Sequence, residues 1–310
     1  MNIKVSVIVP VYNRAHLIRR CLDSVMGQTR KPSELIVVDN GSTDSTREEV
    51  TRWIDENRGY GIKMKLTEEP ERGACNARQK GLKEAEGDLV IFFDSDDEMR
   101  PRLIECSLER FKEKPETDIV CWPCRIKLLD GSHKIPPFLP NKALEGHLIH
   151  ALLRPQGYMV KRDFLEKAGG WGKKVEVWND FELGLRLLLN NPKIEGIDEI
   201  LADIYSQKDS ITGENFTSRE GIWEKTIGEM ERENHLGNHK KKKKIDGMLN
   251  YRRAILAAHY AREGNESGAK KLIKRAKEGK SLKERIVLDF SYHYTRKGLR
   301  GAWRLVRHFF

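Results

Sequence analysis

The stretch GDLVIFFDSDD, residues 87–97, decides the fold. Its five apolar residues, 89–93, are typical of a strand that is buried on both faces of a parallel sheet. Asp94, Asp96 and Asp97 follow at the carboxyl end of this predicted strand, where open parallel sheets bind their ligands. Three carboxylates this close together repel one another and need a compensating charge, which Mg²⁺ or Mn²⁺ can supply. The alternative is a solvated acidic turn that closes a buried strand.

Three further strands precede this one. Residues 5–9 (VSVIV) and 35–38 (LIVV) are apolar runs of the same kind, and the first is predicted to end at Pro10. Residues 62–66 alternate between apolar and polar side chains, which indicates a third strand. Segments with helical periodicity separate the strands. The resulting β-α-β-α-β-α-β order predicts an α/β fold with a doubly wound, Rossmann-like and mostly parallel sheet.

The pattern changes beyond residue 100. Residues 118–129 are predicted to form one strand, and residues 141–170 a helix, a strand and a short helix. From about residue 215 the sequence is helical and charged. Two amphipathic stretches, 249–262 and 266–277, flank Gly264 and predict an αα-hairpin.

The positive charge is concentrated in the last third of the chain. The 310 residues carry a net charge of +10. Residues 211–310 contain 24 Lys or Arg and 12 Asp or Glu, whereas residues 1–210 contain 33 and 35. This asymmetry indicates two parts with different roles. We therefore expect an α/β domain over residues 1–215 and a basic helical region over residues 216–310.

Composition also bears on location. No apolar run reaches the roughly 18 residues that a transmembrane helix needs, and no signal peptide is evident at the N-terminus. The five cysteines are an odd number in a chain large enough to fold without disulfides. A cytoplasmic protein is expected.

Two common phosphate-binding motifs are absent. The sequence has no G-x-G-x-x-G after a strand and no G-x-x-x-x-G-K-[ST] loop. Because both motifs are absent, we expect a nucleotide to be bound without a glycine cradle, by a metal ion and aspartates.

Cys121 and Cys124, in CWPC, resemble a redox pair, but they fall within a predicted strand, where residues three apart point to opposite faces.

Four segments in register carry a resemblance to a known family. They are VSVIVPVYNR (5–14), IVVDNGSTD (36–44), GACNAR (73–78) and GDLVIFFDSDD (87–97). Their order and spacing resemble the family 2 inverting glycosyltransferases with the GT-A fold. The resemblance implies a catalytic domain that moves a sugar, with inversion and with Mn²⁺ or Mg²⁺, from a UDP-sugar or less often a GDP- or dTDP-sugar. It also implies a saccharide or lipid-linked acceptor and a role in cell-surface polysaccharide synthesis.

The resemblance assigns residues to the nucleotide pocket. Pro10, Tyr12 and Asn13 would line it, with the Tyr12 ring offering a flat face to the base. Asp39 would accept a hydrogen bond from the base. Packing at the end of a strand is the alternative for Tyr12, and a helix-start aspartate is the alternative for Asp39. The family usually has Asp where this chain has Asn40.

The resemblance also assigns the diphosphate and metal residues. Arg72 and Arg78 could contact the diphosphate, although either could instead lie on a solvated helix face. Asp94 would contact the ribose and the metal. Asp96 would hold the metal against both phosphates, with Asp97 nearby.

The acceptor half of the family supplies a catalytic base from a Glu-Asp pair before a helix. This chain has Asn179 and then Asp180 at that place, so Asp180 is the predicted base. Its alternative role is that of a helix N-cap. Glu182 and Glu176 are the next candidates. Upstream, the segment GGW, residues 169–171, resembles the family segment that flanks the acceptor site.

One segment departs from the family. Where the family often has a histidine that could help to hold the metal or diphosphate, this chain has YSQKDS, residues 205–210. Lys208 is the candidate to contact the phosphates there, and a closing loop is the alternative.

The C-terminal segment, residues 296–310, interleaves basic and apolar side chains. The basic residues are Arg296, Lys297, Arg300, Arg304 and Arg307, and the apolar ones are Leu299, Trp303, Leu305, Val306, Phe309 and Phe310. Such a helix can lie on the anionic inner leaflet of a membrane, or it can dock on the catalytic domain. The sequence has no recognisable nucleic-acid-binding module, so no nucleic acid partner is expected.

Two rival classes remain open at this point. A nucleotidylyltransferase also combines an α/β sheet with acidic metal ligands, but it is expected to have a glycine-rich loop after the first strand, where this chain has PVYN, residues 10–13. A non-catalytic nucleotide-binding scaffold is the other, suggested by Asn40, Asn179 and the missing histidine.

Overall fold

The chain forms two compact units. The computed structural model describes residues 3–172, 175–207, 216–236, 241–299, 301–306 and 309. The N-terminal unit comprises residues 1–146 and 150–209, and the C-terminal unit comprises residues 147–149 and 210–310. The predicted domain boundary after residue 215 adjoins residues 208–215, which lie outside the described residues, and it stays a prediction.

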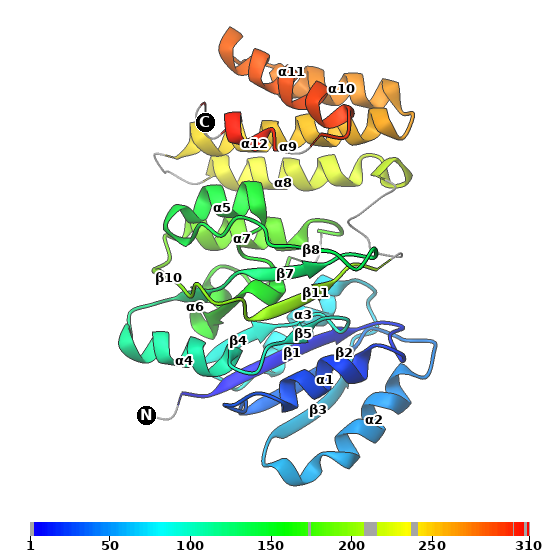
Figure 1. Ribbon diagram of the computed structural model, residues 1–310, viewed down its shortest axis with the longest axis vertical. Helices are drawn as coiled ribbons and strands as arrows, with labels where there is room; N and C mark the ends of the chain where they lie inside the picture. Colours follow the sequence, from blue (N-terminus) through cyan, green and yellow to red (C-terminus); the bar gives the residue numbers. More distant parts are fainter. Residues whose placement is uncertain are drawn as a thin grey trace. The chain divides into compact units, whose positions relative to one another are not determined.

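A seven-stranded sheet forms the centre of the N-terminal unit, in the order β10-β6-β9-β4-β1-β2-β3 (Figure 1). The strands are β1 (Val5–Val11), β2 (Glu34–Asp39), β3 (Lys63–Glu68), β4 (Leu89–Phe92), β6 (Ile119–Cys121), β9 (Tyr158–Lys161) and β10 (Ile194–Gly196). All run parallel except β9, which pairs antiparallel with both β4 and β6. The predicted doubly wound and mostly parallel sheet is therefore confirmed.

Helices cover both faces of this sheet. Val7 and Val9 of β1 belong to one apolar cluster, with α1, α2 and α4, whereas Ile8 belongs to a second, with α3, α6 and α7. The helices are α1 (Ile18–Met26), α2 (Thr46–Glu56), α3 (Ala74–Glu84), α4 (Leu103–Glu113), α6 (Arg162–Lys167) and α7 (Asn179–Leu189). Because successive strand residues point to opposite faces, the apolar runs of the sequence are buried on both sides.

The first strand runs through Pro10 rather than ending there. Pro10 pairs with Val38, and the strand continues to Val11. Proline removes a backbone donor, which an interior strand normally needs. In β1, Ile8 and Pro10 direct their backbone groups towards β4, but the pairing of β1 with β4 ends at Ile8, so no partner strand requires the missing N–H.

The strand predicted over residues 118–129 is two strands in two sheets. Pro123 interrupts it, and β7 (Cys124–Lys127) joins a smaller sheet of order β5-β11-β7-β8, with β5 (Glu98–Met99), β8 (His133–Lys134) and β11 (Ala202–Tyr205). Cys121 and Cys124 are buried free thiols. Burial raises the pKa of Cys124 to about 12, which leaves it unreactive and agrees with the rejection of a redox pair.

The remaining elements complete the chain. The helix, strand and short helix predicted over residues 141–170 are α5 (Ala143–His150), β9 and α6. The short 3₁₀ turns are η1 (Arg58–Tyr60), η2 (Pro140–Lys142), η3 (Pro155–Gly157) and η4 (Phe216–Arg219).

The C-terminal unit is helical, as predicted. Its helices are α8 (Ile222–Leu236), α9 (Lys242–Arg262), α10 (Glu266–Lys277), α11 (Leu282–Arg296) and α12 (Trp303–Val306). The predicted hairpin turn has Gly264 at a φ of +87° and Asn265 as the N-cap of α10. No helix in the described ranges is long and apolar enough to cross a bilayer.

Two helical glycines should respond oppositely to alanine. A Cβ on Gly81 of α3 would lie 2.4 Å from Cγ2 of Ile8, whereas a Cβ on Gly228 of α8 would meet nothing within 4 Å. We expect Gly81→Ala to lower the free energy of unfolding by about 1–3 kcal/mol, because buried Ile8 is stiff and must move. Gly228→Ala should raise it by up to about 1 kcal/mol through helix propensity. Chemical denaturation measures both, and a stabilised Gly81→Ala would contradict the close packing of α3 on β1.

Candidate functional site

Polar loops from three strands meet at one edge of the main sheet. They follow β1 (residues 12–14), β2 (residues 40–44) and β4 (residues 93–97), and parallel neighbours bring their carboxyl ends to the same edge. The antiparallel strand β9 contributes its amino end there instead, so the residues just before Tyr158 face the same region.

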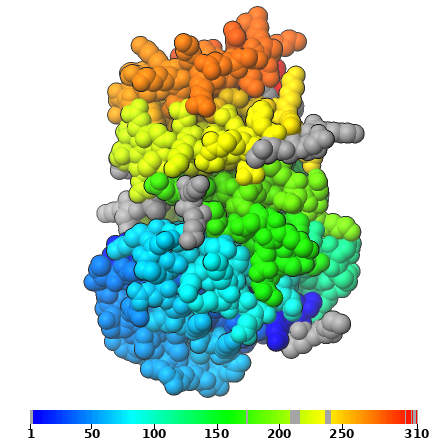
Figure 2. All heavy atoms as spheres, turned by 180° about the vertical axis from the view of Figure 1, so that it is seen from behind, coloured from blue at the N-terminus to red at the C-terminus, as the bar shows by residue number. Residues whose placement is uncertain are grey.

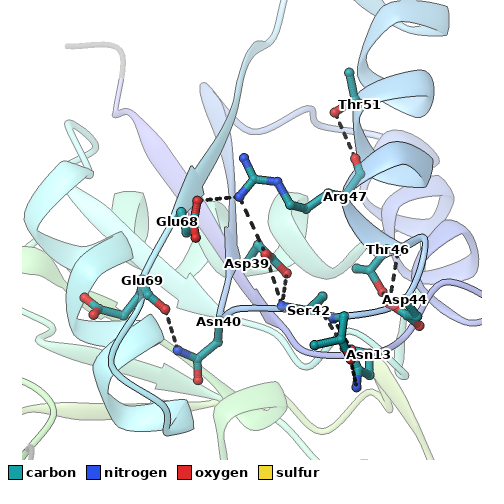
Figure 3. Close-up of polar contacts among 11 residues, drawn as sticks. Asn13, Asp39, Asn40, Ser42, Asp44, Thr46, Arg47, Thr51, Glu68 and Glu69 are labelled. Carbon is teal, nitrogen blue, oxygen red and sulfur yellow. Dashed lines mark hydrogen bonds and ion pairs between the residues drawn. The ribbon is translucent and has the colours of Figure 1, made fainter.

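Hydrogen bonds join the first two loops. Asn13 has a φ of +49°, and its side-chain oxygen accepts a hydrogen bond from the Thr43 N–H at 2.8 Å. The Asn13 N–H donates to Ser42 Oγ at 3.0 Å (Figure 3). The next N–H along the chain, of Arg14, donates to Thr46 Oγ1 at 2.8 Å. Asn13 is therefore a brace between the loops as well as a residue of the predicted nucleotide pocket, and Pro10 lies directly before them in β1.

Asp39 is the last residue of β2 and only 1% exposed. Its two carboxylate oxygens each lie 3.3 Å from the Ser42 N–H nitrogen, and Oδ2 lies 3.8 Å from Arg47 (Figure 3). An ionised carboxylate only accepts hydrogen bonds. Asp39 can therefore receive the N–H of a nucleobase, which is the role predicted for it.

The structure gives a reason for Asn40, the first departure from the family pattern. Its Nδ2 donates to the carbonyl oxygens of Glu69 and Glu71, both at 2.8 Å, and its Oδ1 accepts from the Gly73 N–H at 2.7 Å. An aspartate could accept from Gly73 but could not donate to two carbonyls. Asn40 therefore fixes the loop that carries Arg72.

Arg72 and Arg78, both predicted at the diphosphate, lie in different surroundings. The Arg72 guanidinium carbon lies 4.1 Å from the ring centroid of Tyr12, which is 42% exposed. The Arg72 guanidinium therefore covers one face of the Tyr12 ring, which leaves the other face for a base. Arg78, by contrast, is buried beside Asp94.

The acidic run after β4 is organised by a residue that no sequence pattern indicated. Gln156 is buried in η3, and its Nε2 lies 2.6 Å from Asp94 Oδ2 and 2.5 Å from Asp97 Oδ2. Asp97 also accepts a hydrogen bond from the Tyr205 N–H at 2.9 Å. Asp94 lies 2.7 Å from Arg78, whereas Asp96 Oδ2 lies 3.8 Å from Arg14 Nε. Gln156 belongs to no motif and sits far along the chain, so only the fold brings it here.

Burial and like charge disfavour the ionised forms of Asp96 and Asp97. Burial, followed by the charge of Asp94, raises the pKa of Asp96, and the same causes raise that of Asp97 well above its usual range. No three acidic, His or Cys side chains among the described residues form a ready-made metal cage. Mg²⁺ and Mn²⁺ need fewer protein ligands when phosphates and water complete the shell. Asp96 and Asp94 fit that requirement.

Arg78 connects this run to the predicted base. Its Nη2 lies 2.7 Å from Asp94 Oδ1, its Nη1 donates to Asn179 Oδ1 at 3.2 Å, and its guanidinium lies 4.6 Å from the Trp171 ring centroid. Asp180 follows Asn179 in the first turn of α7. The fold therefore brings together residues of the predicted donor and acceptor sites that lie about 85 residues apart in the sequence (94 and 179).

Asp180 does not cap its helix. The N-cap of α7 is Trp178, at a φ of +51°, so the alternative that Asp180 serves as the N-cap is wrong. Asp180 is partly buried, and burial raises its pKa against the opposing charges of Arg78 and Arg154. A base with a raised pKa holds a proton more strongly, which suits proton abstraction.

The other candidate bases lie in different settings. Glu182 forms a buried ion pair with Arg186, with contacts of 2.5 and 2.9 Å, and Arg186 also donates to the carbonyl oxygens of Ala168 and Gly170. This pair clamps the segment 169–171 onto α7. Glu176 is exposed. Lys208 lies outside the described residues.

Comparisons with known proteins agree with this geometry. Residues 6–146 match the family model for glycosyl transferase family 2. The chain is 31% identical over 120 residues to glycosyltransferase GlyG of Streptococcus pneumoniae, covering 39% of this chain and 38% of that one. It is 32% identical over 137 residues to the cholesterol galactosyltransferase of Borreliella burgdorferi, covering 44% and 37%. The chain thus spans well under half the length of these relatives.

Solved structures share the fold. Staphylococcus aureus TarS 1–349 in complex with UDP superposes with a TM-score of 0.67 at 19% identity, over 95% of this chain and 92% of that one. The mannosyltransferase PcManGT from Pyrobaculum calidifontis, in complex with GDP-Man and Mn²⁺, gives 0.58 at 21% identity, over 96% and 84%. The chain therefore shares the GT-A fold of these structures, and residues 6–146, just under half of it, match glycosyl transferase family 2.

Replacing Asn40 by aspartate tests the brace on the 69–73 loop. We expect Asn40→Asp to lower the free energy of unfolding by about 1–3 kcal/mol, because the carbonyl oxygens of Glu69 and Glu71 lose their donor and face a carboxylate. Denaturant titration measures the change, and the exposed Asn141→Asp is the matched control. A variant as stable as the wild type would show that the hydrogen bonds of Asn40 do not hold the loop.

Replacing Asp180 by asparagine should raise the free energy of unfolding and abolish the transfer of sugar to an acceptor. Because the pKa of Asp180 is higher in the folded than in the unfolded chain, the folded state loses stability as pH rises between the two values. Asp180→Asn avoids that loss, so it should be more stable than the wild type at pH 7, by about 1.4 kcal/mol for each tenfold displacement of the protonation equilibrium. The gain should vanish at pH values below both pKa values.

Thermal unfolding at several pH values measures this difference, and the exposed Glu116→Gln is the control. An Asp180→Asn variant that is less stable at pH 7 would indicate a structural carboxylate instead. Activity should also rise with pH through a value above 3.8, the ordinary pKa of aspartate, because the base acts when deprotonated.

Proposed function

We propose that the chain is an inverting glycosyltransferase that moves a sugar from a UDP-sugar to a saccharide or lipid-linked acceptor. The observation that carries the proposal is the position of Arg78, which binds Asp94 of the donor loop and Asn179 beside the base. One buried cation therefore binds both Asp94 and the residue next to Asp180. The match of residues 6–146 to the model of glycosyl transferase family 2 supports the same reaction class.

The proposed reaction is a single displacement. Asp180 accepts the proton of the acceptor hydroxyl as its oxygen attacks the anomeric carbon. The bond from that carbon to the diphosphate oxygen breaks, its electron pair stays on the diphosphate, and the nucleoside diphosphate leaves from the opposite face. Attack opposite to the leaving group inverts the anomeric centre.

Other residues of this chain would bind the nucleotide and the metal ion during that step. Asp39 and Tyr12 would hold the base, Asp94 the ribose, and Asp96 with Asp94 a Mn²⁺ or Mg²⁺ ion. The ion would supply positive charge to the diphosphate leaving group. Arg72, stacked on Tyr12, would contact the nucleotide from above the ring. In support of this donor class, TarS has been solved with UDP and with UDP-GlcNAc, and PcManGT with GDP-Man.

Two observations count against the rival classes. The match of residues 6–146 to the family model favours glycosyl transfer over nucleotidyl transfer, and PVYN stands where a glycine-rich loop would be needed. Asn40 makes three hydrogen bonds that an aspartate could not all make, and Asn179 binds Arg78. Neither asparagine therefore indicates a degenerate site.

The proposed setting is the cytoplasm, on the inner face of a membrane where lipid-linked acceptors are made into surface polysaccharide. The basic C-terminal segment was predicted either to contact that membrane or to dock on the catalytic domain. Among its described residues, Ala302 and Val306 are buried in the C-terminal unit with Tyr251 and Leu288. Arg300, Arg307 and Phe310 lie outside the described residues. Docking of this segment therefore uses the helices of its own unit.

Binding of the nucleotide can be measured directly. We expect UDP to bind in titration calorimetry with Mn²⁺ present and much more weakly without it, because carboxylates and phosphates otherwise repel. Asp96→Ala should remove the dependence on Mn²⁺ and weaken binding at least about tenfold, whereas the exposed Glu116→Ala should not. Failure of UDP, GDP and dTDP alike to bind with Mn²⁺ would refute the proposal. Binding of GDP alone would correct the donor.

A further inference from the structure

The outer face of α11 exposes a row of large apolar side chains. Leu282 is 74% exposed, Ile286 59% and Phe290 43%. Residues four apart lie about 40° apart around a helix, so these three occupy one face. Figure 2 shows the side chains of this part of the sequence, in orange, on the surface of the C-terminal unit. Hereafter the row Leu282, Ile286 and Phe290 is called the α11 face.

The α11 face is separate from the side that packs in the unit. Val287, Leu288, Ser291 and Tyr292 are the buried residues of the helix. Val287 and Leu288 join an apolar cluster with Tyr251 of α9 and with α12. The helix thus has its ordinary core contacts on one side and a second apolar surface on the other.

Such exposure is concentrated in one region. Nine large apolar side chains are exposed among the described residues, and five of them fall within residues 282–309: the α11 face with Leu299 and Phe309. Scattered exposed apolar residues need no explanation, but a contiguous set marks an interaction surface. No corresponding row exists in the described part of the sheet unit, where exposed Tyr12, Tyr60, Leu129 and Ile135 come from separate loops and turns.

The sequence that carries the α11 face is strongly basic. Residues 271–310 contain 12 Lys or Arg and 3 Asp or Glu. Both acids of α11 are engaged locally, since Glu284 accepts hydrogen bonds from Ser281 and Asp289 pairs with Lys277 at 2.8 Å. Lys283 and Arg285 are exposed on the same helix, adjacent to the row. Apolar surface flanked by positive charge is therefore what a partner would meet.

We propose that the α11 face, with Lys283 and Arg285 beside it, binds the surface of an anionic lipid bilayer. The apolar row would enter the boundary between headgroups and acyl chains, while the basic side chains contact the anionic headgroups. This refines the proposed membrane location but does not depend on the transferase reaction. It also moves the lipid contact from the C-terminal segment, whose described Ala302 and Val306 point inwards, to α11.

Charge favours an anionic bilayer over the two other possible partners of the α11 face, a second copy of the chain and a nucleic acid. A second copy of the chain would bring the same excess of Lys and Arg against itself, and that repulsion opposes pairing through this face. A nucleic acid would match the charge but would not require a row of aliphatic and aromatic side chains. An anionic bilayer matches both the charge and the apolar row.

The experiment is co-sedimentation of the full chain with lipid vesicles. We expect binding to vesicles of phosphatidylcholine mixed with phosphatidylglycerol, little binding to phosphatidylcholine alone, and weaker binding as salt rises. The double variant Ile286→Glu with Phe290→Glu should lower the partition coefficient by about tenfold or more, and Lys283→Glu with Arg285→Glu by a similar factor. Ile135→Glu, at a residue 47% exposed in the N-terminal unit, is the matched control and should bind as the wild type does.

Several results would overturn the inference. They are a wild type that ignores anionic vesicles, an Ile286→Glu, Phe290→Glu variant that binds them equally well, and a wild-type dimer that this variant dissociates. Circular dichroism and thermal unfolding verify that the variants fold, which their exposed positions favour. UDP titration on the same samples separates the two proposals. A wild type that binds UDP but does not bind vesicles refutes only the lipid contact. A wild type that binds vesicles but does not bind UDP refutes only the donor site.

Discussion

The site depends on one buried positive charge. A guanidinium removed from water is costly unless negative and polar partners surround it, and Arg78 finds them in Asp94, Asn179 and the face of Trp171. These partners come from the end of β4, the start of α7 and the segment before it. Because one cation needs all of them, the two halves of the site are held in a common arrangement.

The sequence predicted the frame of the site better than its interior. The apolar runs 5–9, 35–38 and 89–93 fix which strands are central, and parallel pairing then brings their polar ends together. Gln156 could not be foreseen, because a buried glutamine in a short turn has no periodicity. The split at Pro123 was missed for a related reason, since only the second sheet shows that the residues after it change partners.

Local chemistry explains residues that depart from the family pattern. Asn40 must donate twice and accept once, which suits an amide and not a carboxylate. Asn179 binds Arg78 without adding a negative charge beside Asp180, so the arginine keeps its ion pair with Asp94. The requirement at each position is set by neighbours distant in the sequence, and no motif records it.

The reversed direction of β9 has a consequence for where the chain can be shortened. Because β9 enters the sheet between β4 and β6, it brings Gln156 to Asp97, which lies 59 residues earlier in the sequence. A chain that ended before β9 would keep β1 to β4 and their carboxyl ends, but it would lack the amide that binds both Asp94 and Asp97. The sheet edge and the order of the carboxylates on it are therefore encoded in separate parts of the sequence.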